Sequence, residues 1–291
     1  MEKNNCNTAL VLIFGVIAVS TSAIFIKLST APSAVIAFYR LFIAAALMSP
    51  FIHLKGRSGF GLLRGRTLLY TCLAGGCLAL HFLLWFESLQ YTSVASSVFF
   101  VTLSPLFSYL GGYFFYGETL SWRQISDGST AIIGGLIIGY GDLQLSGIAL
   151  RGDLLAVSGA AAAAGYWLIG QNVRKELPAF AYTYILYTAS AAVLLIYALG
   201  TRSPLFSFSK MDGLIFLLLA LIPTLLGHSL FNWLLRWASA TSISTSILAE
   251  SVIASVLAYL IFGEKISICQ WVGGALIVAG IYRFIHKEWR K

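Results

Sequence analysis

Apolar runs long enough to cross a lipid bilayer recur along almost the whole of this chain. A transmembrane helix needs about 20 mostly apolar residues, and several of the runs reach that length individually. The composition agrees, because 58% of the 291 residues are hydrophobic and only 10% are charged, whereas soluble domains carry roughly 25% charged residues. A water-soluble fold cannot bury this much apolar surface, so we predict an all-α integral membrane protein.

Charged and turn residues divide the apolar runs into ten expected transmembrane helices. The first run is long and lacks a cleavage pattern, so we interpret it as a membrane helix and not as a signal peptide. The fifth and tenth spans are the shortest. The expected spans are residues 8–28, 32–53, 67–90, 92–116, 122–140, 154–173, 179–199, 211–236, 241–262 and 268–285.

The basic residues between these spans predict the orientation of the chain, because Lys and Arg are retained on the cytoplasmic side of a membrane. With the N-terminus inside, thirteen of the 19 Lys and Arg residues fall on the cytoplasmic side, five fall on the opposite side, and Arg40 alone lies within a span. We therefore predict a multi-pass protein of the cell membrane with both termini in the cytoplasm. The basic residues form no single patch, so nucleic acid is not an expected partner.

The chain also repeats itself. A shift of 146 residues superposes residues 84–134 on residues 230–280 with eleven identities. The identities cluster around one turn and include the pairs Gly117/Gly263, Glu118/Glu264 and Ser121/Ser267. This pattern predicts two five-helix repeats, residues 1–146 and 147–291. Since five is an odd number, the second repeat is expected to be inverted in the membrane, an arrangement that recurs in secondary transporters.

Five short motifs give the chain a family resemblance. They are Phe38–Leu41, Ser104-Pro105, Tyr113–Glu118, Phe262–Ser267 and Gly273–Leu276. In these motifs the chain resembles the drug/metabolite transporter superfamily, in particular its EamA-type members. The resemblance implies ten helices, a central cavity lined by the first, third, fourth, sixth, eighth and ninth of them, and export or exchange of amino acids and other small metabolites. One position departs from the repeat, because Glu250-Ser251 stands in the second half where the first half has Ser104-Pro105.

A secondary transporter is the leading functional hypothesis, and two others remain open. The sequence has no ATP-binding pattern, so uphill transport of a small-molecule substrate would use an ion gradient, with a proton as the candidate coupling ion. A membrane-embedded enzyme would need acidic or His/Asp pairs such as Asp-x-x-x-Asp, which the sequence lacks. A non-transporting receptor or assembly factor is the third hypothesis. No cofactor or metal site is predicted, because the cysteines lack C-x-x-C spacing and no phosphate-binding pattern is present.

Four ionisable residues, Arg40, His81, His228 and Glu250, are expected deep in the membrane, where charges are costly and usually face a cavity or a partner. Glu250 is the single acid predicted near mid-membrane, and it follows Ser242 and Ser246 at successive four-residue steps. We expect it to face the cavity as a proton carrier or as an anion that binds an ammonium group. A buried ion pair with Arg40 is the structural alternative, and Arg40 itself is interpreted as a structural charge.

Two histidines are expected to line the cavity from the two halves. His228 and Asn232 are four residues apart, so one face of the eighth helix carries both. His81 and Trp85 have the same spacing in the third helix, and the repeat aligns His81 with the residue before His228. The alternative for each histidine is a hydrogen bond to a neighbouring backbone carbonyl.

Most of the aromatic residues are expected to face lipid or the membrane interface. Tyr166 and Trp167 lie on the sixth expected helix and Trp85 lies on the third, both of which the resemblance assigns to the cavity wall. We therefore predict these three side chains as substrate contacts.

Glu118 and Glu264 occupy the two Gly-Glu turns, just before the fifth and tenth expected helices. An acid there complements the partial positive charge of a helix N-terminus. We predict structural roles for both.

The orientation leads to a first testable prediction. Single cysteines at Arg57 and Lys287 should react with a membrane-impermeant thiol reagent only from the cytoplasmic side, and Ser203→Cys should react only from the opposite side. Labelling would be compared in intact cells and in inside-out vesicles. Reaction of the cysteine at position 57 in intact cells would contradict the predicted orientation.

Overall fold

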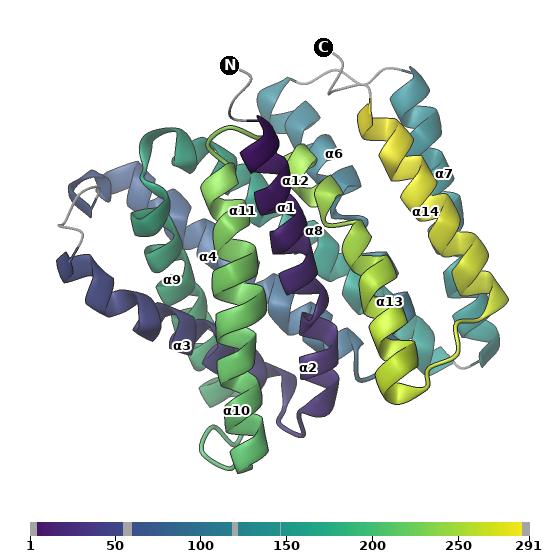
Figure 1. Cartoon of the computed structure of the whole chain (residues 1–291), viewed down its shortest axis with the longest axis horizontal. Coiled ribbons are helices and arrows are strands. Elements are labelled where there is room, and N and C mark those ends of the chain that lie inside the picture. The colour runs from purple at the N-terminus through teal and green to yellow at the C-terminus, as the bar shows by residue number, and fades with distance from the viewer. Residues whose placement is uncertain (1–4, 55–59, 118–121, 146, 287–291) are drawn as a thin grey trace.

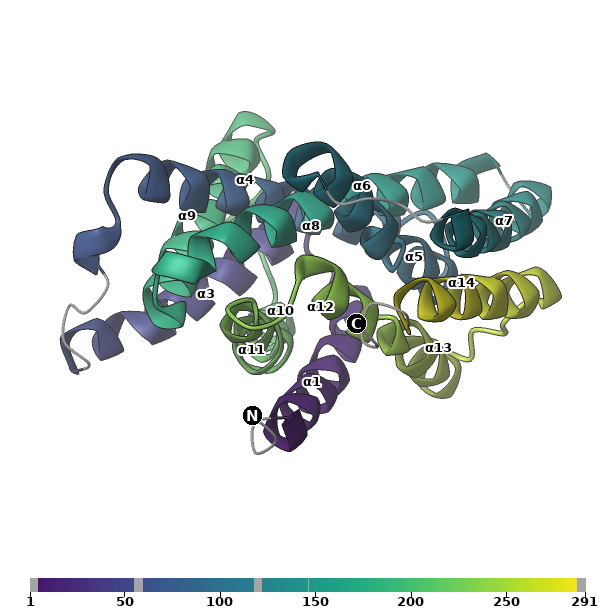
Figure 2. The same cartoon turned by 90° about the horizontal axis from the view of Figure 1, so that it is seen from above.

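The computed structural model describes residues 5–54, 60–117, 122–145 and 147–286. All regular structure in these ranges is helical, and none of the described residues lies in a strand. Figures 1 and 2 show the helices side by side, with α7 and α14 at one edge of the molecule and α3 and α9 at the other. The elements are α1 (Asn5–Ser20), α2 (Ser22–Leu28), α3 (Ser33–Leu54), η2 (Phe60–Leu62), α4 (Gly65–Ser88), α5 (Val94–Val101), α6 (Ser104–Tyr116), α7 (Trp122–Leu145), α8 (Gly147–Glu176), α9 (Ala179–Gly200), α10 (Lys210–Leu219), η3 (Ala220–His228), α11 (Ser229–Leu234), α12 (Ala240–Ser246), α13 (Ala249–Phe262) and α14 (Ile268–His286).

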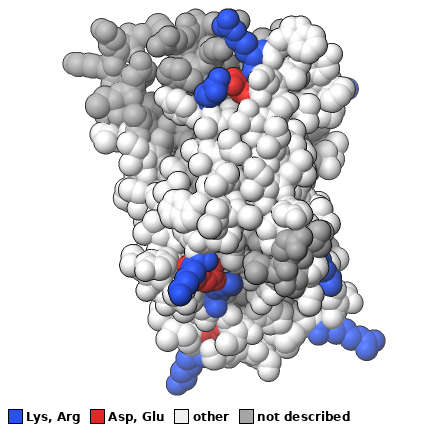
Figure 3. All heavy atoms as spheres, turned by 90° about the vertical axis from the view of Figure 1, so that its right-hand side faces the viewer, with Lys and Arg blue, Asp and Glu red and all other residues white. Residues whose placement is uncertain are grey.

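Seven helices of the described chain are long and apolar enough to cross a membrane. Figure 3 shows a broad surface of uncharged residues with Lys, Arg, Asp and Glu gathered toward its two ends, as expected of a protein surrounded by lipid. The protein is therefore a multi-pass membrane protein. Helices α13 and α14 contain shorter apolar stretches.

The helix ends differ from the expected spans around residue 146. Helix α7 continues from its expected end at residue 140 to Leu145, and α8 begins at Gly147, seven residues before the expected start at 154. Hydropathy marks the part of a helix that suits hydrocarbon, whereas the backbone hydrogen bonds continue into more polar residues. The hydropathy pattern therefore underestimates the lengths of both helices.

Two helices are interrupted at positions related by the repeat. Helix α5 ends at Val101 and α6 begins at Ser104, and Pro105 in the first turn of α6 lacks the N–H that would continue the helical bonding. In the second half, α12 ends at Ser246 and α13 begins at Ala249, although no proline is present there. The second interruption thus occurs without the residue that explains the first.

A π-helix, η3, joins α10 to α11. It contains Pro223, and its wide turn lets the Thr224 hydroxyl donate to the carbonyl of Leu219, five residues earlier, at 2.7 Å. Short π-helical segments are rare and occur frequently at functional sites. This one ends at His228, one of the predicted cavity residues.

Glycines allow α7 and α14 to approach closely. A Cβ atom at Gly134 would lie 2.5 Å from the carbonyl oxygen of Gly273, and one at Gly280 would lie 2.7 Å from the carbonyl oxygen of Asp127. Small residues commonly permit such close packing of membrane helices. Since Gly134 and Gly280 are 146 residues apart, the two repeats contribute equivalent residues to this interface.

Candidate functional site

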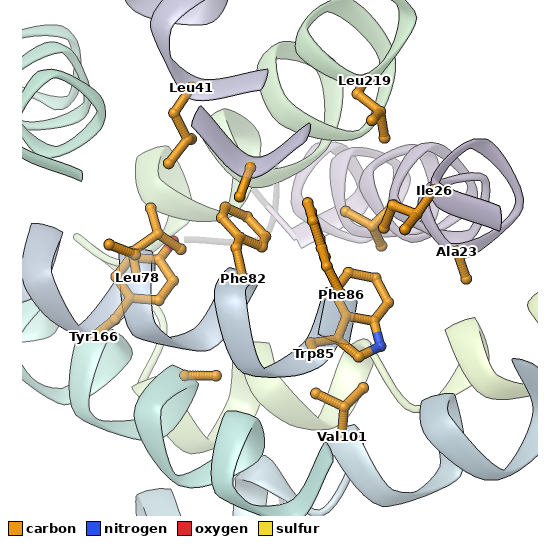
Figure 4. Close-up of a cluster of buried hydrophobic side chains, with 14 of the residues drawn as sticks. Ala23, Ile26, Leu41, Leu78, Phe82, Trp85, Phe86, Val101, Tyr166 and Leu219 are labelled. Atoms are coloured by element: carbon orange, nitrogen blue, oxygen red, sulfur yellow. The ribbon is translucent and has the colours of Figure 1, made fainter. Parts of the chain in front are cut away.

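A small cavity of about 30 Å³ lies among helices from both halves of the chain. Space of this size holds about two water molecules. In Figure 4, Trp85 of α4 lies beside Phe86 and above Val101 of α5. The lining residues are Val19, Ser22, His81, Trp85, Val101, Thr102, Ser104, Ala163, Tyr166, Trp167, His228, Ile247 and Glu250.

Six of the seven predicted cavity residues meet in this lining. The helical spacing explains the grouping, because residues three and four apart share one face of a helix. His81 and Trp85 therefore project together from α4, and Tyr166 and Trp167 project from α8 beside Ala163. Helix α8 packs against α4, with Gly159 close to the backbone of Trp85.

Two stacked histidine–tryptophan pairs form part of the wall. The rings of His81 and Trp85 lie 5.8 Å apart with an interplanar angle of 18°. The rings of Trp167 and His228 lie 6.1 Å apart at 10°. Each pair thus offers a flat aromatic surface and polar ring nitrogens to the same small space.

The two histidines differ in their hydrogen bonds. His81 Nδ1 lies 2.9 Å from the carbonyl oxygen of Gly159. Because a carbonyl only accepts, Nδ1 carries the hydrogen, as in the backbone-bonding alternative. His228 Nδ1 is buried without a hydrogen-bond partner, as is Trp85 Nε1. Buried polar atoms are normally paired, so these two ring nitrogens are available to a bound molecule.

Arg40 lies behind the cavity and is fully buried. Its Nε donates to the Thr224 hydroxyl at 2.6 Å, its Nη1 donates to the Ser22 hydroxyl at 2.8 Å, and its guanidinium carbon stands 4.1 Å from the centre of the Phe82 ring. The π-helical turn presents Thr224 to this contact. Arg40 therefore joins α3, α2, α4 and η3.

Glu250 lines the cavity and is 5% exposed. It lies in the first turn of α13, where the helix N-terminus favours an acidic side chain. The predicted serine stripe is not continuous, because α12 ends at Ser246, and the side chain of Ser242 lies outside the described residues. The two ion pairs of the described chain do not include a contact between Glu250 and Arg40.

Asn232 is the predicted cavity residue that stands behind the wall. Its Oδ1 accepts a hydrogen bond of 2.5 Å from the Tyr166 hydroxyl, and its backbone carbonyl accepts one of 2.8 Å from Arg174 Nε. Arg174, which is 2% exposed, also donates to the carbonyl of Leu177. Asn232 thus positions an aromatic residue of the wall.

Glu264, in the connection between α13 and α14, joins α2 and α5 at one end of the molecule. Its Oε1 accepts from Lys27 Nζ of α2 at 2.7 Å, and its Oε2 accepts from the backbone N–H of Val94 at 3.0 Å. The carboxylate therefore caps the N-terminus of α5 and not that of α14. Val94 lies seven residues before the cavity residue Val101, about 10 Å along α5. Glu118 lies outside the described residues.

Asp212 makes a second connection, to Ser29 and Thr30, which follow the end of α2 shortly after Lys27. It accepts hydrogen bonds from the Ser29 hydroxyl at 2.6 Å and from the backbone N–H of Thr30 at 2.9 Å. A capping box with Ser209 orients the same carboxylate. We call these contacts of Glu264 and Asp212 the acidic clamp. The clamp connects the two halves of the chain.

Sequence reasoning did not identify several of these polar residues. Ser104 precedes Pro105 in the first turn of α6, so the helix interruption was a usable signal for Thr102 and Ser104. Asp212 lies three residues after Ser209, which is the spacing of a helix capping box, and this sequence pattern could have identified Asp212. Ser22 had no distinguishing signal, because its role depends on Arg40 of another helix. Within the described ranges, no three His, Cys, Asp or Glu side chains are grouped to hold a metal ion.

The architecture matches that of known proteins. A family model described as the EamA-like transporter family matches residues 7–140 and 150–285. A solved crystal structure is similar with a TM-score of 0.72 and 18% identity, and the match covers 98% of this chain and 99% of the other. At that identity, the likeness supports the fold alone.

Curated relatives match at low identity. An uncharacterized transporter of Clostridium kluyveri is 26% identical over 66% of this chain and 64% of its own length. An uncharacterized transporter of Bacillus subtilis is 26% identical over 72% and 70%, respectively. A probable amino-acid metabolite efflux pump of Escherichia coli is 23% identical over 64% and 65%. The chain thus spans just under two thirds of the Clostridium and Escherichia proteins.

Proposed function

The chain belongs to the EamA-like transporter family, and from that premise we propose that it is a secondary-active exporter or exchanger of amino acids or related small metabolites. The name of the relative from Escherichia coli, a probable amino-acid metabolite efflux pump, supports this substrate class. The relatives from Clostridium, Bacillus and Escherichia are all named as transporters or efflux pumps, which favours transport over an enzymatic activity. The observation that carries the proposal is the cavity, which combines a buried carboxylate with unpaired ring nitrogens.

The chemistry of the cavity suits an amino acid. The Glu250 carboxylate can accept hydrogen bonds from an ammonium group, and an indole N–H at Trp85 can donate to a carboxylate. The stacked aromatic rings offer apolar contact to a side chain between these ends. His81, Tyr166, Trp167 and His228 complete this proposed site, and Asn232, Arg40 and Glu264 support it.

Alternating access is the proposed mechanism. Ten helices in two inverted halves, with both termini in the cytoplasm, would give two related states that open to opposite sides. The present cavity is too small for an amino acid, so under this mechanism the site would have to widen before it binds substrate. The acidic clamp is the proposed gate on the non-cytoplasmic side, because Lys27 and Glu264 lie beyond the cavity residues of α2 and α13.

The gate proposal predicts an effect of Glu264→Gln. The amide keeps an acceptor for the Val94 N–H but loses the ion pair with Lys27, which is partly exposed and worth up to about 1 kcal/mol. Labelling of a Thr102→Cys reporter from the non-cytoplasmic side should rise by up to about fivefold, measured in a background without the native cysteines. Lys265→Gln removes a neighbouring exposed charge and is the control. Equal labelling in both variants would exclude the clamp as a gate.

Trp85 and Trp167 are predicted to contact substrate, but both are nearly fully buried, so alanine would also leave a large hole. Trp85→Phe retains an aromatic ring and removes the unpaired Nε1. Loss of one hydrogen bond should weaken substrate affinity about 3- to 10-fold, measured as KM for flux in proteoliposomes. Trp233→Phe, at an exposed tryptophan outside the cavity, is the matched control. An unchanged KM would remove Trp85 from the proposed site.

Glu250→Gln separates two roles of the carboxylate. If Glu250 carries the coupling proton, the variant should lose accumulation driven by a pH gradient and retain substrate exchange. If Glu250 instead remains an ammonium-binding anion, binding should weaken at every pH. Glu87→Gln, at an acid outside the cavity, controls for loss of charge. Normal flux with an unchanged pH profile would leave Glu250 with neither role.

Flux itself tests the proposal against its alternatives. Purified protein in proteoliposomes would be screened with labelled amino acids and related metabolites, with thermal shift as the binding assay. Binding without flux would favour a receptor or assembly factor, and chemical conversion of a substrate would favour an enzyme.

A further inference from the structure

A second and larger cavity opens on the outer surface between α3 and α9. It has a volume of about 410 Å³, within the roughly 300–1,000 Å³ of small-molecule sites. Helices α3 and α9 pack against each other at the edge of the molecule opposite α7 and α14 (Figure 2). Both helices are membrane spans, so the cavity faces lipid and not water. We call it the α3–α9 groove.

Apart from the Tyr184 hydroxyl at one end, the hydroxyl groups that line the groove are bonded within their own helices. The Ser49 hydroxyl donates to the carbonyl of Ala46 at 2.8 Å, and the Thr188 hydroxyl donates to the carbonyl of Tyr184 at 2.8 Å. Both hydroxyls therefore bond within their own helices. The remaining lining is alanine, leucine and aromatic carbon, including the stacked rings of Phe38 and Phe42 at 5.4 Å. Such a surface selects an apolar occupant.

The length of the groove fits one acyl chain. Its walls run from Phe38 to Ser49 on α3 and from Tyr184 to Leu195 on α9, which at 1.5 Å per residue is about 16 Å on each side. Half of a hydrocarbon core of about 30 Å is about 15 Å, the depth that one leaflet's chains occupy. This length suits one acyl chain. Because five residues of each helix lie beyond the groove at either end, its centre coincides with the centre of each span, and a chain bound along it would pass the mid-plane of the bilayer.

One end of the groove adjoins a basic turn. The Tyr184 ring at that end contacts the Phe60 ring, with 6.0 Å between the ring centres. Phe60 begins the short helix η2, and Arg64 and Arg66 follow it at the start of α4. Both arginines are exposed, and neither belongs to an ion pair of the described chain. The N-cap of α4 also lacks a side-chain hydrogen bond, which leaves its first N–H groups to other acceptors.

From this juxtaposition we propose that the α3–α9 groove binds an anionic phospholipid, with one acyl chain in the groove and the phosphate at Arg64 and Arg66. Basic residues beside membrane helices attract anionic headgroups. In this proposal the α3–α9 groove holds the acyl chain, and the two arginines favour a negatively charged headgroup. This site is separate from the central cavity and does not depend on the transport proposal.

The test uses phosphatidylglycerol with a photoactivatable acyl chain, in nanodiscs of phosphatidylcholine that contain the full-length protein. The probe should cross-link mainly to peptides of α3 and α9. Ala192→Trp fills the groove and should reduce this labelling at least several-fold, whereas Val193→Trp, on the exposed surface beside it, should not. The double variant Arg64→Gln/Arg66→Gln should reduce the preference for phosphatidylglycerol over phosphatidylcholine roughly 30-fold.

Three results would overturn the proposal. These are labelling spread evenly over the lipid-facing helices, labelling unaffected by Ala192→Trp in a variant with a normal size-exclusion profile, and an unchanged lipid preference in the double arginine variant. Efficient disulfide formation between two copies of Ala46→Cys would also overturn it, because it would identify a second copy of the chain as the occupant.

Discussion

The contacts of Arg40 connect the two halves of the molecule at their centre. Its guanidinium group bonds Ser22 in the first half and Thr224 in the second, and it stands over the ring of Phe82. A buried charge needs such partners, and a hydrogen bond to a charged group is typically worth about 1.5–3 kcal/mol. The position of Thr224 depends on the π-helical turn, which also sets the direction of His228. Arg40 thus links the global packing to one wall of the cavity.

The interrupted helices follow from a related constraint. Backbone groups inside a membrane must be hydrogen-bonded, unless they adjoin protein or a cavity. The interruptions after Val101 and after Ser246 both occur beside the cavity, which Thr102 and Ile247 line. Irregular backbone is therefore confined to the region where polar partners are available. The same arrangement brings Glu250 to the start of a helix, where its charge is favoured.

The sequence predicted most of the helical architecture, because each apolar run reports directly on the length of a membrane span. The family resemblance is confirmed by the match over residues 7–140 and 150–285. Helical spacing and the repeat also brought His81 and His228 to one cavity, although their roles remain predictions. Helical spacing alone could not show that Asn232 lies behind the cavity wall. Asn232 shares a helix face with His228, but Tyr166 covers it. The α3–α9 groove was not predicted, because a groove depends on the packing of two helices distant in sequence.

The two halves are similar in sequence but differ in the groups that cap equivalent helices. The backbone N–H of Val94 donates to the Glu264 carboxylate at 3.0 Å, whereas that of Ala240, 146 residues later, donates to the amide oxygen of Gln171 at 2.6 Å. The first acceptor is charged and paired with Lys27, and the second is neutral. Under the proposed alternating access, these two contacts would therefore respond differently to salt, since ionic strength screens a partly exposed ion pair but has little effect on a neutral hydrogen bond.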